Sequence, residues 1–235
     1  MNEFIKACKC GDVEKVKQLL PSVDPSTDGN YAIRLVASYG HLEVVRLLLD
    51  DKRVNPSDGA NYAIKCASMN GHVEVVRFLL SDTRVDPSDD NNSAIQLASQ
   101  NGHIEVVRLL LADKRVDPSD DNSAIQLASE NGYTEVVRLL LSDSRVDPSA
   151  DCNFAIKCAS QNGHVEVVRL LLTDSRVDPS AKDNYAIRVA SSNGHVEVVR
   201  LLLQDSRVDA SKAESTKTEI KELLAQWKYH PSRNT

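Results

Sequence analysis

Apolar and polar positions repeat along this chain with a long and nearly constant period. The block Glu-Val-Val-Arg-(Leu or Phe)-Leu-Leu occurs six times, at steps of 31, 31, 30, 31 and 31 residues, beginning at Glu43, Glu74, Glu105, Glu135, Glu166 and Glu197. The segment Val-(Asp or Asn)-Pro-Ser recurs at the same period, with prolines at Pro25, Pro56, Pro87, Pro118, Pro148 and Pro179. A fixed period of this length is typical of repeat proteins, in which each copy is one small supersecondary element.

Each copy predicts two short helices and a connecting segment. In the second copy the first helix is expected over residues 61–69, beginning at an Asn whose side chain accepts a hydrogen bond from its own first turn. It should end at Gly71, which tolerates a left-handed backbone. The second helix, residues 72–81, is apolar except for one polar stripe, formed by Glu74, Arg77 and Ser81. A helix with so narrow a polar edge must be buried on several sides, and stacked copies provide that burial.

The motifs resemble those of ankyrin repeats. The stretch Gly-His-Val-Glu-Val-Val-Arg at 71–77, with its counterparts, carries the resemblance, which covers residues 3–211. The sequence departs from the family pattern at 62–68, where Tyr-Ala-Ile-Lys-Cys-Ala-Ser replaces the Thr-Pro-Leu-His-x-Ala signature, and its period is shorter than the usual 33. Copies of this shorter form are similar to ankyrin arrays of giant DNA viruses and single-celled eukaryotes.

The resemblance implies an all-α fold, an ankyrin-type α-solenoid of stacked helix-turn-helix repeats. Because the period is short, the connecting segments, called fingers below, should be tighter than usual or should not pair as strands. We expect a single domain over residues 1–235, which divides into an N-terminal capping repeat (3–23), six full repeats (24–211), a C-terminal capping helix (212–229) and a flexible tail (230–235).

The two ends carry apolar faces that suit caps. Residues 3–20 combine a Phe4, Ile5 and Cys8 face with positions that stay polar. Residues 216–219 read as a capping box before a helix over about 216–229, which is apolar at Ile220, Leu223, Leu224 and Trp227. A helix that binds a partner is the alternative interpretation of this last segment.

Charge and composition exclude several classes of function. The net charge is −6, and residues 24–211 contain 19 Lys and Arg against 28 Asp and Glu, which disfavours nucleic acid and anionic lipid as partners. No apolar run is long enough to span a membrane or to form a secretion signal. The five cysteines are an odd number and two of them lie in helical patterns, so we expect reduced thiols and an intracellular location, cytoplasmic or nuclear. We also expect a monomer.

The sequence shows no pattern typical of catalysis, of a metal site or of a cofactor site. Five histidines follow the repeated glycine, but successive copies stand one repeat apart and cannot converge on one ion. Each is expected to order its own inter-helix turn. The Asp pairs at 89–90 and 120–121 lack the alternate spacing of a calcium loop, and no Gly-rich phosphate loop is present. We therefore expect no enzyme activity and no cofactor.

What remains is recognition of a partner protein. The resemblance implies that partners bind the concave side, formed by the fingers and the exposed edges of the first helices. Nearly identical copies differ at a few phases on this side. The candidate partner-binding residues are Tyr31, Tyr39, Tyr62, Met69, Asp89, Asp90, Gln96, Gln100, Asp120, Asp121, Gln126, Glu130, Phe154, Gln161 and Tyr185.

The variable positions suggest a specific surface. The third and fourth repeats carry adjacent acids and neutral Gln residues, whereas their neighbours carry aromatic and cationic ones. We expect an acidic notch there, rimmed by aromatic side chains, that binds a Lys/Arg-containing segment. Recent duplication of one repeat would produce the same pattern without a function. Two other hypotheses stay open: an acidic peptide bound by the first-helix cations, and a targeting adaptor that presents a client to other machinery.

Overall fold

The computed structural model describes residues 2–229, and this part of the chain contains fifteen α-helices, one 3-10 turn and no strand. The expected all-α helical-repeat fold is confirmed, and so is the expectation that the fingers do not pair as strands. The chain divides into two compact units, residues 1–120 and 121–235. The expectation of one domain over the whole chain stays a prediction, and the expected tail at 230–235 lies outside the described residues.

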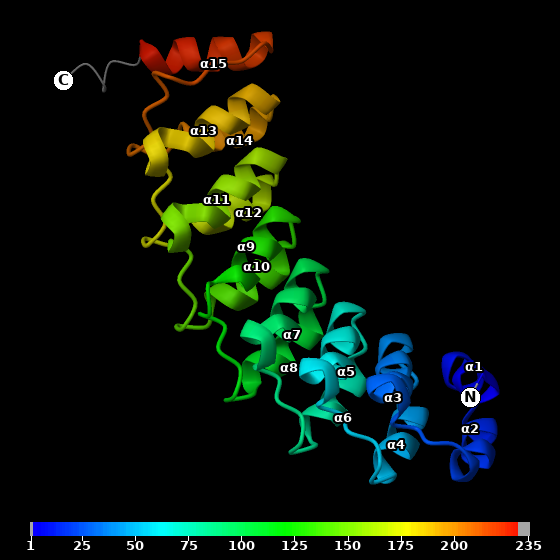
Figure 1. Cartoon of the computed structure of the whole chain (residues 1–235). Helices are drawn as coiled ribbons and strands as arrows, with labels where there is room; N and C mark the ends of the chain where they lie inside the picture. The colour runs from blue at the N-terminus through cyan, green and yellow to red at the C-terminus, as the bar shows by residue number, and fades with distance from the viewer. Residues whose placement is uncertain (1, 230–235) are drawn as a thin grey trace. The chain divides into compact units, whose positions relative to one another are not determined.

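The first unit contains four helix pairs, which appear in order at the N-terminal, blue to green end of Figure 1. Its first helices pack side by side in one row, and its second helices form a second row against them. The pairs are α1 (Asn2–Cys10) with α2 (Val13–Leu19) and the 3-10 turn Leu20–Ser22, α3 (Thr27–Tyr39) with α4 (Leu42–Asp50), α5 (Asp58–Met69) with α6 (Val73–Leu80), and α7 (Asp89–Gln100) with α8 (Ile104–Ala112).

The second unit repeats this arrangement with three pairs and a final helix. The pairs are α9 (Ser123–Glu130) with α10 (Thr134–Leu141), α11 (Ala150–Asn162) with α12 (Val165–Leu172), and α13 (Ala181–Asn193) with α14 (Val196–Leu202). Within the unit α11 packs between α9 and α13, and α12 lies against α10 and α14. The last helix, α15 (Thr218–Lys228), packs against α14.

Each repeat contributes the same apolar set to its core. In the second repeat Ile64, Val75, Val76, Leu79 and Val85 are almost fully buried. Small residues of the first helices, such as Ala63 and Ala67, are buried as well, which lets neighbouring helices approach closely. Burying one aliphatic side chain contributes about 1.5–3 kcal/mol. One repeat buries few such groups by itself, so its stability depends on the neighbours in its row.

The start of the first helix differs from the prediction. Three residues near the start of α5 are left-handed and interrupt the helical backbone, with φ of 63°, 57° and 55° at Gly59, Ala60 and Asn61. Asn61 does not cap its own helix with its side chain. Its Oδ1 accepts a hydrogen bond from the backbone N–H of Asp86 at 2.8 Å, and its Nδ2 donates to Asp89 Oδ2 at 2.9 Å. Both partners belong to the next finger, so this Asn joins two repeats instead of starting one helix.

The Asn contact recurs along the chain, in two forms. The backbone form, Asn Oδ1 to the next finger's N–H, is present at Asn30, Asn61, Asn92, Asn122, Asn153 and Asn184. The side-chain form, Asn Nδ2 to an Asp of the next finger, occurs in the first unit at Asn30–Asp58, Asn61–Asp89 and Asn92–Asp120. After Asn122 and Asn153 that Asp position holds Ala150 and Ala181.

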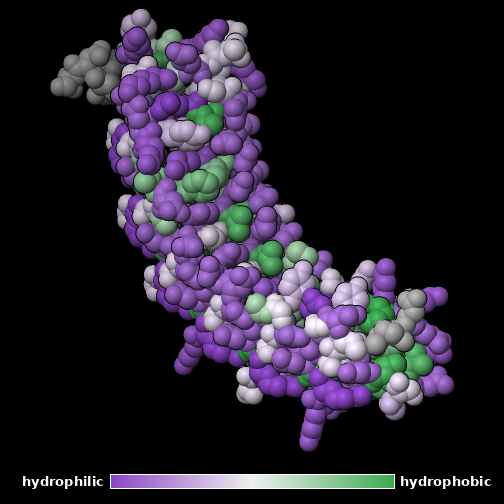
Figure 2. Space-filling model, in the orientation of Figure 1, coloured by the Kyte–Doolittle hydropathy of each residue, from purple (hydrophilic) through white to green (hydrophobic). Residues whose placement is uncertain are grey.

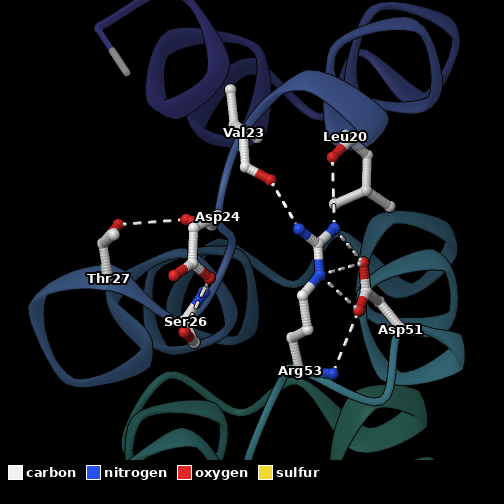
Figure 3. Close-up of polar contacts among 7 residues, drawn as sticks. All are labelled: Leu20, Val23, Asp24, Ser26, Thr27, Asp51 and Arg53. Carbon is white, nitrogen blue, oxygen red and sulfur yellow. Dashed lines mark hydrogen bonds and ion pairs between the residues drawn. The ribbon is translucent and has the colours of Figure 1, made fainter.

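A recurring arginine forms a second contact between repeats, which the sequence interpretation missed. Figure 3 shows Arg53 held by Asp51, with Nη2 2.6 Å from Asp51 Oδ2, while it donates to the carbonyl oxygens of Val23 (2.9 Å) and Leu20 (3.3 Å). Those carbonyls belong to the preceding repeat. The backbone contact recurs at Arg84 with Val54 and at Arg176 with Val146. Because the donor is a charged guanidinium, these hydrogen bonds are stronger than bonds between neutral groups.

The repeated histidines also contact the preceding repeat, so the prediction that each orders its own turn is wrong. His72 Nε2 lies 2.9 Å from the carbonyl oxygen of Ser38, and His103 Nε2 lies 2.9 Å from that of Met69. A carbonyl oxygen can only accept, so Nε2 carries the hydrogen in both. The ring stands against the preceding repeat's glycine: a Cβ added to Gly71 would come within 2.5 Å of His103 Nδ1. Gly71 has φ of 74°, as predicted for the helix end.

The C-terminal helix begins later than predicted, and the expected capping box does not form. Its N-cap residue is Lys217, in extended conformation and without a side-chain cap. Lys217 Nζ instead donates to the carbonyl oxygen of Gly194 at 2.7 Å. Of the predicted apolar face only Ile220 is fully buried, while Leu223, Leu224 and Trp227 are half-buried. At the other end Phe4 and Cys8 are buried as expected, but Ile5 is half-exposed.

Candidate functional site

The candidate contact positions lie on the exposed edges of the first helices. Each aromatic ring just inside the helix is about two-fifths exposed: Tyr31 41%, Tyr62 45%, Phe154 39% and Tyr185 38%. The positions near the helix end are exposed too: Tyr39, Met69, Gln100, Glu130 and Gln161. Gln96 and Gln126, in the middle, are half-buried. Figure 2 shows a mostly hydrophilic face on which apolar side chains form separate spots.

In the first unit the aromatic residues gather around cations. Arg34 lies between two rings, 5.7 Å from the centre of Tyr31 and 5.6 Å from that of Tyr62. Lys65 lies 5.7 Å from the Tyr62 ring, is only 8% exposed, and forms an ion pair of 2.9 Å with Asp90. The Lys65 ammonium hydrogen bond is the main cause that lowers the pKa of Asp90. The cations here are therefore largely satisfied within the unit.

The predicted acidic residues of the first unit also have structural partners. Asp89 and Asp120 each accept a hydrogen bond of 2.9 Å from the Asn of the preceding repeat, and Asp90 holds Lys65. Asp89 and Asp120 are half-buried and Asp90 is exposed. Asp121 belongs to the second unit, where it is exposed and its carbonyl accepts a hydrogen bond from Gln126 at 3.4 Å. The acidic notch stays a prediction.

The second unit has an open groove between the edges of α11 and α13. Its volume is about 440 Å³, and it is lined by Glu130, Phe154, Lys157, Cys158, Gln161, Lys182 and Tyr185. Four of these were candidate contact residues. The two lysines were not, although the first-helix cations had been noted as a binding alternative. A neighbouring depression of about 480 Å³ shares Tyr185 and includes Arg188, Lys212 and Glu214.

The cysteine in this groove is not an activated nucleophile. Burial, followed by the charge of Glu130, raises the pKa of the Cys158 thiol to about 11. A thiol with this pKa is protonated at neutral pH, and the thiolate is the reactive form. Cys158 therefore contributes a small apolar surface to the groove.

Among residues 2–229 no three His, Cys, Asp or Glu side chains come close enough together to hold a metal ion. No helix in the same range is both long and apolar enough to cross a bilayer. The described site is an exposed surface for contacts, shaped by helix edges and fingers.

Comparison with known families gives one match. A family model for ankyrin repeats matches the chain in three copies, at residues 4–91, 82–153 and 145–214. These ranges cover the helix pairs from the third residue of α1 onward and reach the segment after α14. No curated protein resembles the chain closely enough to count as a match.

Proposed function

Because the chain belongs to the ankyrin-repeat family, whose members are general protein–protein interaction modules, we propose that it is a scaffold that holds a partner protein. The partner would contact the fingers and the exposed edges of the first helices, the concave side in this family. Family members are typically non-enzymatic scaffolds, and we propose the same for this chain.

One observation carries this proposal: large aromatic rings remain exposed at one phase of the repeat. Tyr31, Tyr62, Phe154 and Tyr185 occupy the same position in four repeats, and all are about two-fifths exposed. The buried positions of the same helices hold nearly invariant Ala and Ile across the copies. Aromatic side chains are the residues most enriched at interaction hot spots. Variation confined to the exposed edge is what a surface adapted to a particular partner requires.

We also propose that the exposed acids of the third and fourth repeats bind a Lys/Arg-containing segment of the partner. Asp90 and Asp121 are exposed, and Asn at these positions keeps the shape of the side chain and tolerates the left-handed backbone found there, φ of 56° and 49°. We expect that Asp90→Asn with Asp121→Asn weakens binding of a Lys/Arg-containing partner and reduces its salt dependence. Unchanged affinity and salt dependence would remove the acids from the binding surface.

Site-specific photo-crosslinking in the source cell tests the scaffold proposal. A photoreactive phenylalanine analogue would replace Tyr62 or Tyr185 on the first-helix edges, and Arg77 or Arg169 on the exposed stripe of the second helices as matched controls. We expect the edge positions to crosslink one recurrent partner protein, and the stripe positions to give none. Crosslinks from the stripe alone would place the interaction elsewhere and contradict the proposal. If the protein is instead a targeting adaptor, the edge positions should crosslink a client protein, and further proteins of the attached machinery should co-purify with it.

A further inference from the structure

We propose that the groove between α11 and α13 binds an acidic protein segment that also carries at least one aliphatic or aromatic side chain. This inference rests on the proposed scaffold function and adds the site and the chemistry of the partner. It follows from three observations within the second unit: two lysines that form no ion pair, exposed rings beside them, and a glutamate at each end of the row of cations.

The cations of this groove are not neutralised by the protein itself. Lys157 Nζ donates to a backbone carbonyl, that of Asp151, at 3.2 Å, and lies 5.2 Å from the Phe154 ring centre. The nearby Asp151 carboxylate accepts from Gln126 Nε2 at 2.9 Å. Lys182 is exposed and makes no hydrogen bond or ion pair with any residue of the described part of the chain. Two lysines thus line the groove without forming an ion pair to a carboxylate of the described chain.

The corresponding cation of the first unit shows the contrast. Lys65, at the same phase as Lys157, forms an ion pair with Asp90 and is buried. The start of α7 supplies that carboxylate, whereas Lys182 stands in the matching position at the start of α13. The substitution of Asp by Lys reverses the charge at this position. The second unit therefore leaves this position open to a partner carboxylate, where the first unit fills it with its own.

The groove also requires an apolar contact. Phe154 and Tyr185 leave 39% and 38% of their surface exposed, and both line the depression together with the neutral Cys158 thiol. Covering such rings removes apolar surface from water, which is the main favourable contribution to most associations. A purely acidic chain would leave this surface uncovered, so the segment should combine acidic with apolar residues.

The acids at the ends favour a protein segment over a nucleic acid. Glu130 lines one side of the groove, and Glu214 lines the neighbouring depression beyond Tyr185. The cations between these two glutamates are Lys157, Lys182, Arg188 and Lys212. Arg188 and Lys212 both form ion pairs with Asp183, at 3.6 Å and 2.8 Å. A phosphate backbone carries a charge at every nucleotide and would place some against the two glutamates. A peptide can concentrate its acids in the middle.

Peptide binding to the full chain tests the inference. A fluorescein-labelled peptide of alternating Glu and Leu with one Phe would be titrated by anisotropy, next to an all-Glu peptide and a Lys/Leu peptide of equal length. The Glu/Leu peptide should bind most tightly. The double variant Lys157→Gln/Lys182→Gln should weaken it at least tenfold, and the salt dependence should fall. Phe154→Ser should weaken it at least fivefold.

The variants are chosen so that the fold tolerates them. Gln stands at the phase of Lys157 in Gln96 and Gln126, and Ser stands at the phase of Phe154 in Ser93 and Ser123. The matched control is Arg138→Gln/Arg169→Gln, which removes the same charge from the stripe of α10 and α12, where these arginines pair with Glu135 and Glu166. The control should change the affinity by less than twofold.

Several outcomes would overturn the inference. They are tighter binding of the Lys/Leu peptide, equal competition by a single-stranded oligonucleotide, or an unchanged affinity in the Lys157→Gln/Lys182→Gln variant. If any of these occurs while Tyr62 still crosslinks a partner protein, the groove assignment fails and the scaffold function stands. If neither Tyr62 nor Tyr185 crosslinks a protein, the scaffold proposal fails independently of the peptide result.

Discussion

Asn61 shows how much a single residue does in this fold. It is 4% exposed, has a left-handed backbone, and forms two hydrogen bonds to the next finger. Asn adopts this backbone more readily than other non-glycine residues, because its short polar side chain can bond locally. Its position in the sequence is therefore determined by backbone shape and by the contact between repeats together.

Asn61→Ala should destabilise the protein by about 2–4 kcal/mol. The change leaves the N–H of Asp86 without its acceptor and adds the cost of a left-handed alanine. Urea unfolding followed by circular dichroism measures the effect. The control is Asn61→Gly, which loses the same hydrogen bonds without the backbone cost and should be less destabilising by about 1 kcal/mol. Equal stability of wild type and both variants would contradict the bridging role.

The sequence predicted this residue's importance but not its role. Asn is a favoured residue at a helix start because its side chain can accept a hydrogen bond from the first turn, which is why we placed a helix start there. A side-chain cap and a bridge to the next repeat need the same residue type, and the periodicity cannot separate them. The difference lies in three successive left-handed residues, two of which, Ala60 and Asn61, are not glycine. No propensity rule predicts alanine with positive φ.

At the scale of elements, the glycine at the helix end and the histidine of the next repeat form one junction. Gly71→Ala should cost about 2–4 kcal/mol, because it strains a backbone with φ of 74° and drives a Cβ to within 2.5 Å of His103 Nδ1. Gly59→Ala is the control: its φ is 63°, but the nearest atom to the new Cβ is 3.5 Å away. It should cost only about 1–2 kcal/mol. Thermal unfolding compares the two, and equal costs would mean that the histidine contact is unimportant.

The Asp-Arg pairs after the second helices should make stability depend on pH. The hydrogen bond from Arg84 is the main cause that lowers the pKa of Asp82 in the folded protein. Because the pKa of Asp82 is lower in the folded protein than in the unfolded chain, its ionised form stabilises the fold fully at pH values above the unfolded pKa of about 3.9. This contribution to stability is lost as the pH falls through the folded pKa. Asp82→Asn should therefore be less stable than wild type above about pH 5, and the gap should narrow below about pH 4.

Urea unfolding at a series of pH values measures this gap. Glu74→Gln is the control, since Glu74 forms only an exposed pair with Arg77, 3.5 Å away, and such pairs contribute little. Its stability should stay within about 0.5 kcal/mol of wild type at every pH. A gap for Asp82→Asn that is constant from acid to neutral pH would show that ionisation of Asp82 does not contribute.

Elements were predictable to the extent that burial determines them. The second helix, expected over 72–81, is Val73–Leu80 with His72 and Ser81 as caps, because its apolar pattern leaves one consistent orientation. The C-terminal capping box failed where the sequence offered a local motif but the structure uses a longer contact, Lys217 Nζ to Gly194. Side chains that reach into a neighbouring repeat were missed in each case, since their partners lie about 30 residues away in sequence.

At the scale of the whole molecule, the final helix should unfold before the rest of its unit. Ile220 is its one fully buried apolar residue, and the ion pair of Arg200 with Glu219, at 3.2 Å, is exposed. Ile220→Ala should lower the urea midpoint reported by Trp227, the single tryptophan, more than the midpoint reported by circular dichroism. Gln226→Ala, on the exposed side of α15, should change neither. Coincident shifts of both signals would show that α15 unfolds together with its unit.

The candidate site was predictable in kind but not in detail. Family motifs indicated the first-helix edges, and the exposed rings of Tyr62, Phe154 and Tyr185 agree with that expectation. The sequence could not show which charges are already paired. The sequence does not show that Asp90 is paired with Lys65, nor that Lys182 forms no ion pair. Only the contacts in the structure show this difference.

The uneven distribution of the Asn contacts has a consequence for rearranging this chain. Repeats that carry Asp58, Asp89 or Asp120 accept a hydrogen bond from the Asn side chain of the repeat before them. The copies with Ala150 and Ala181 at this position lack that acceptor. If a copy from the second unit were moved behind a repeat of the first unit, the Asn Nδ2 of that preceding repeat would lose its Asp acceptor. In a shuffled or lengthened array, each copy should therefore be chosen to match the repeat before it.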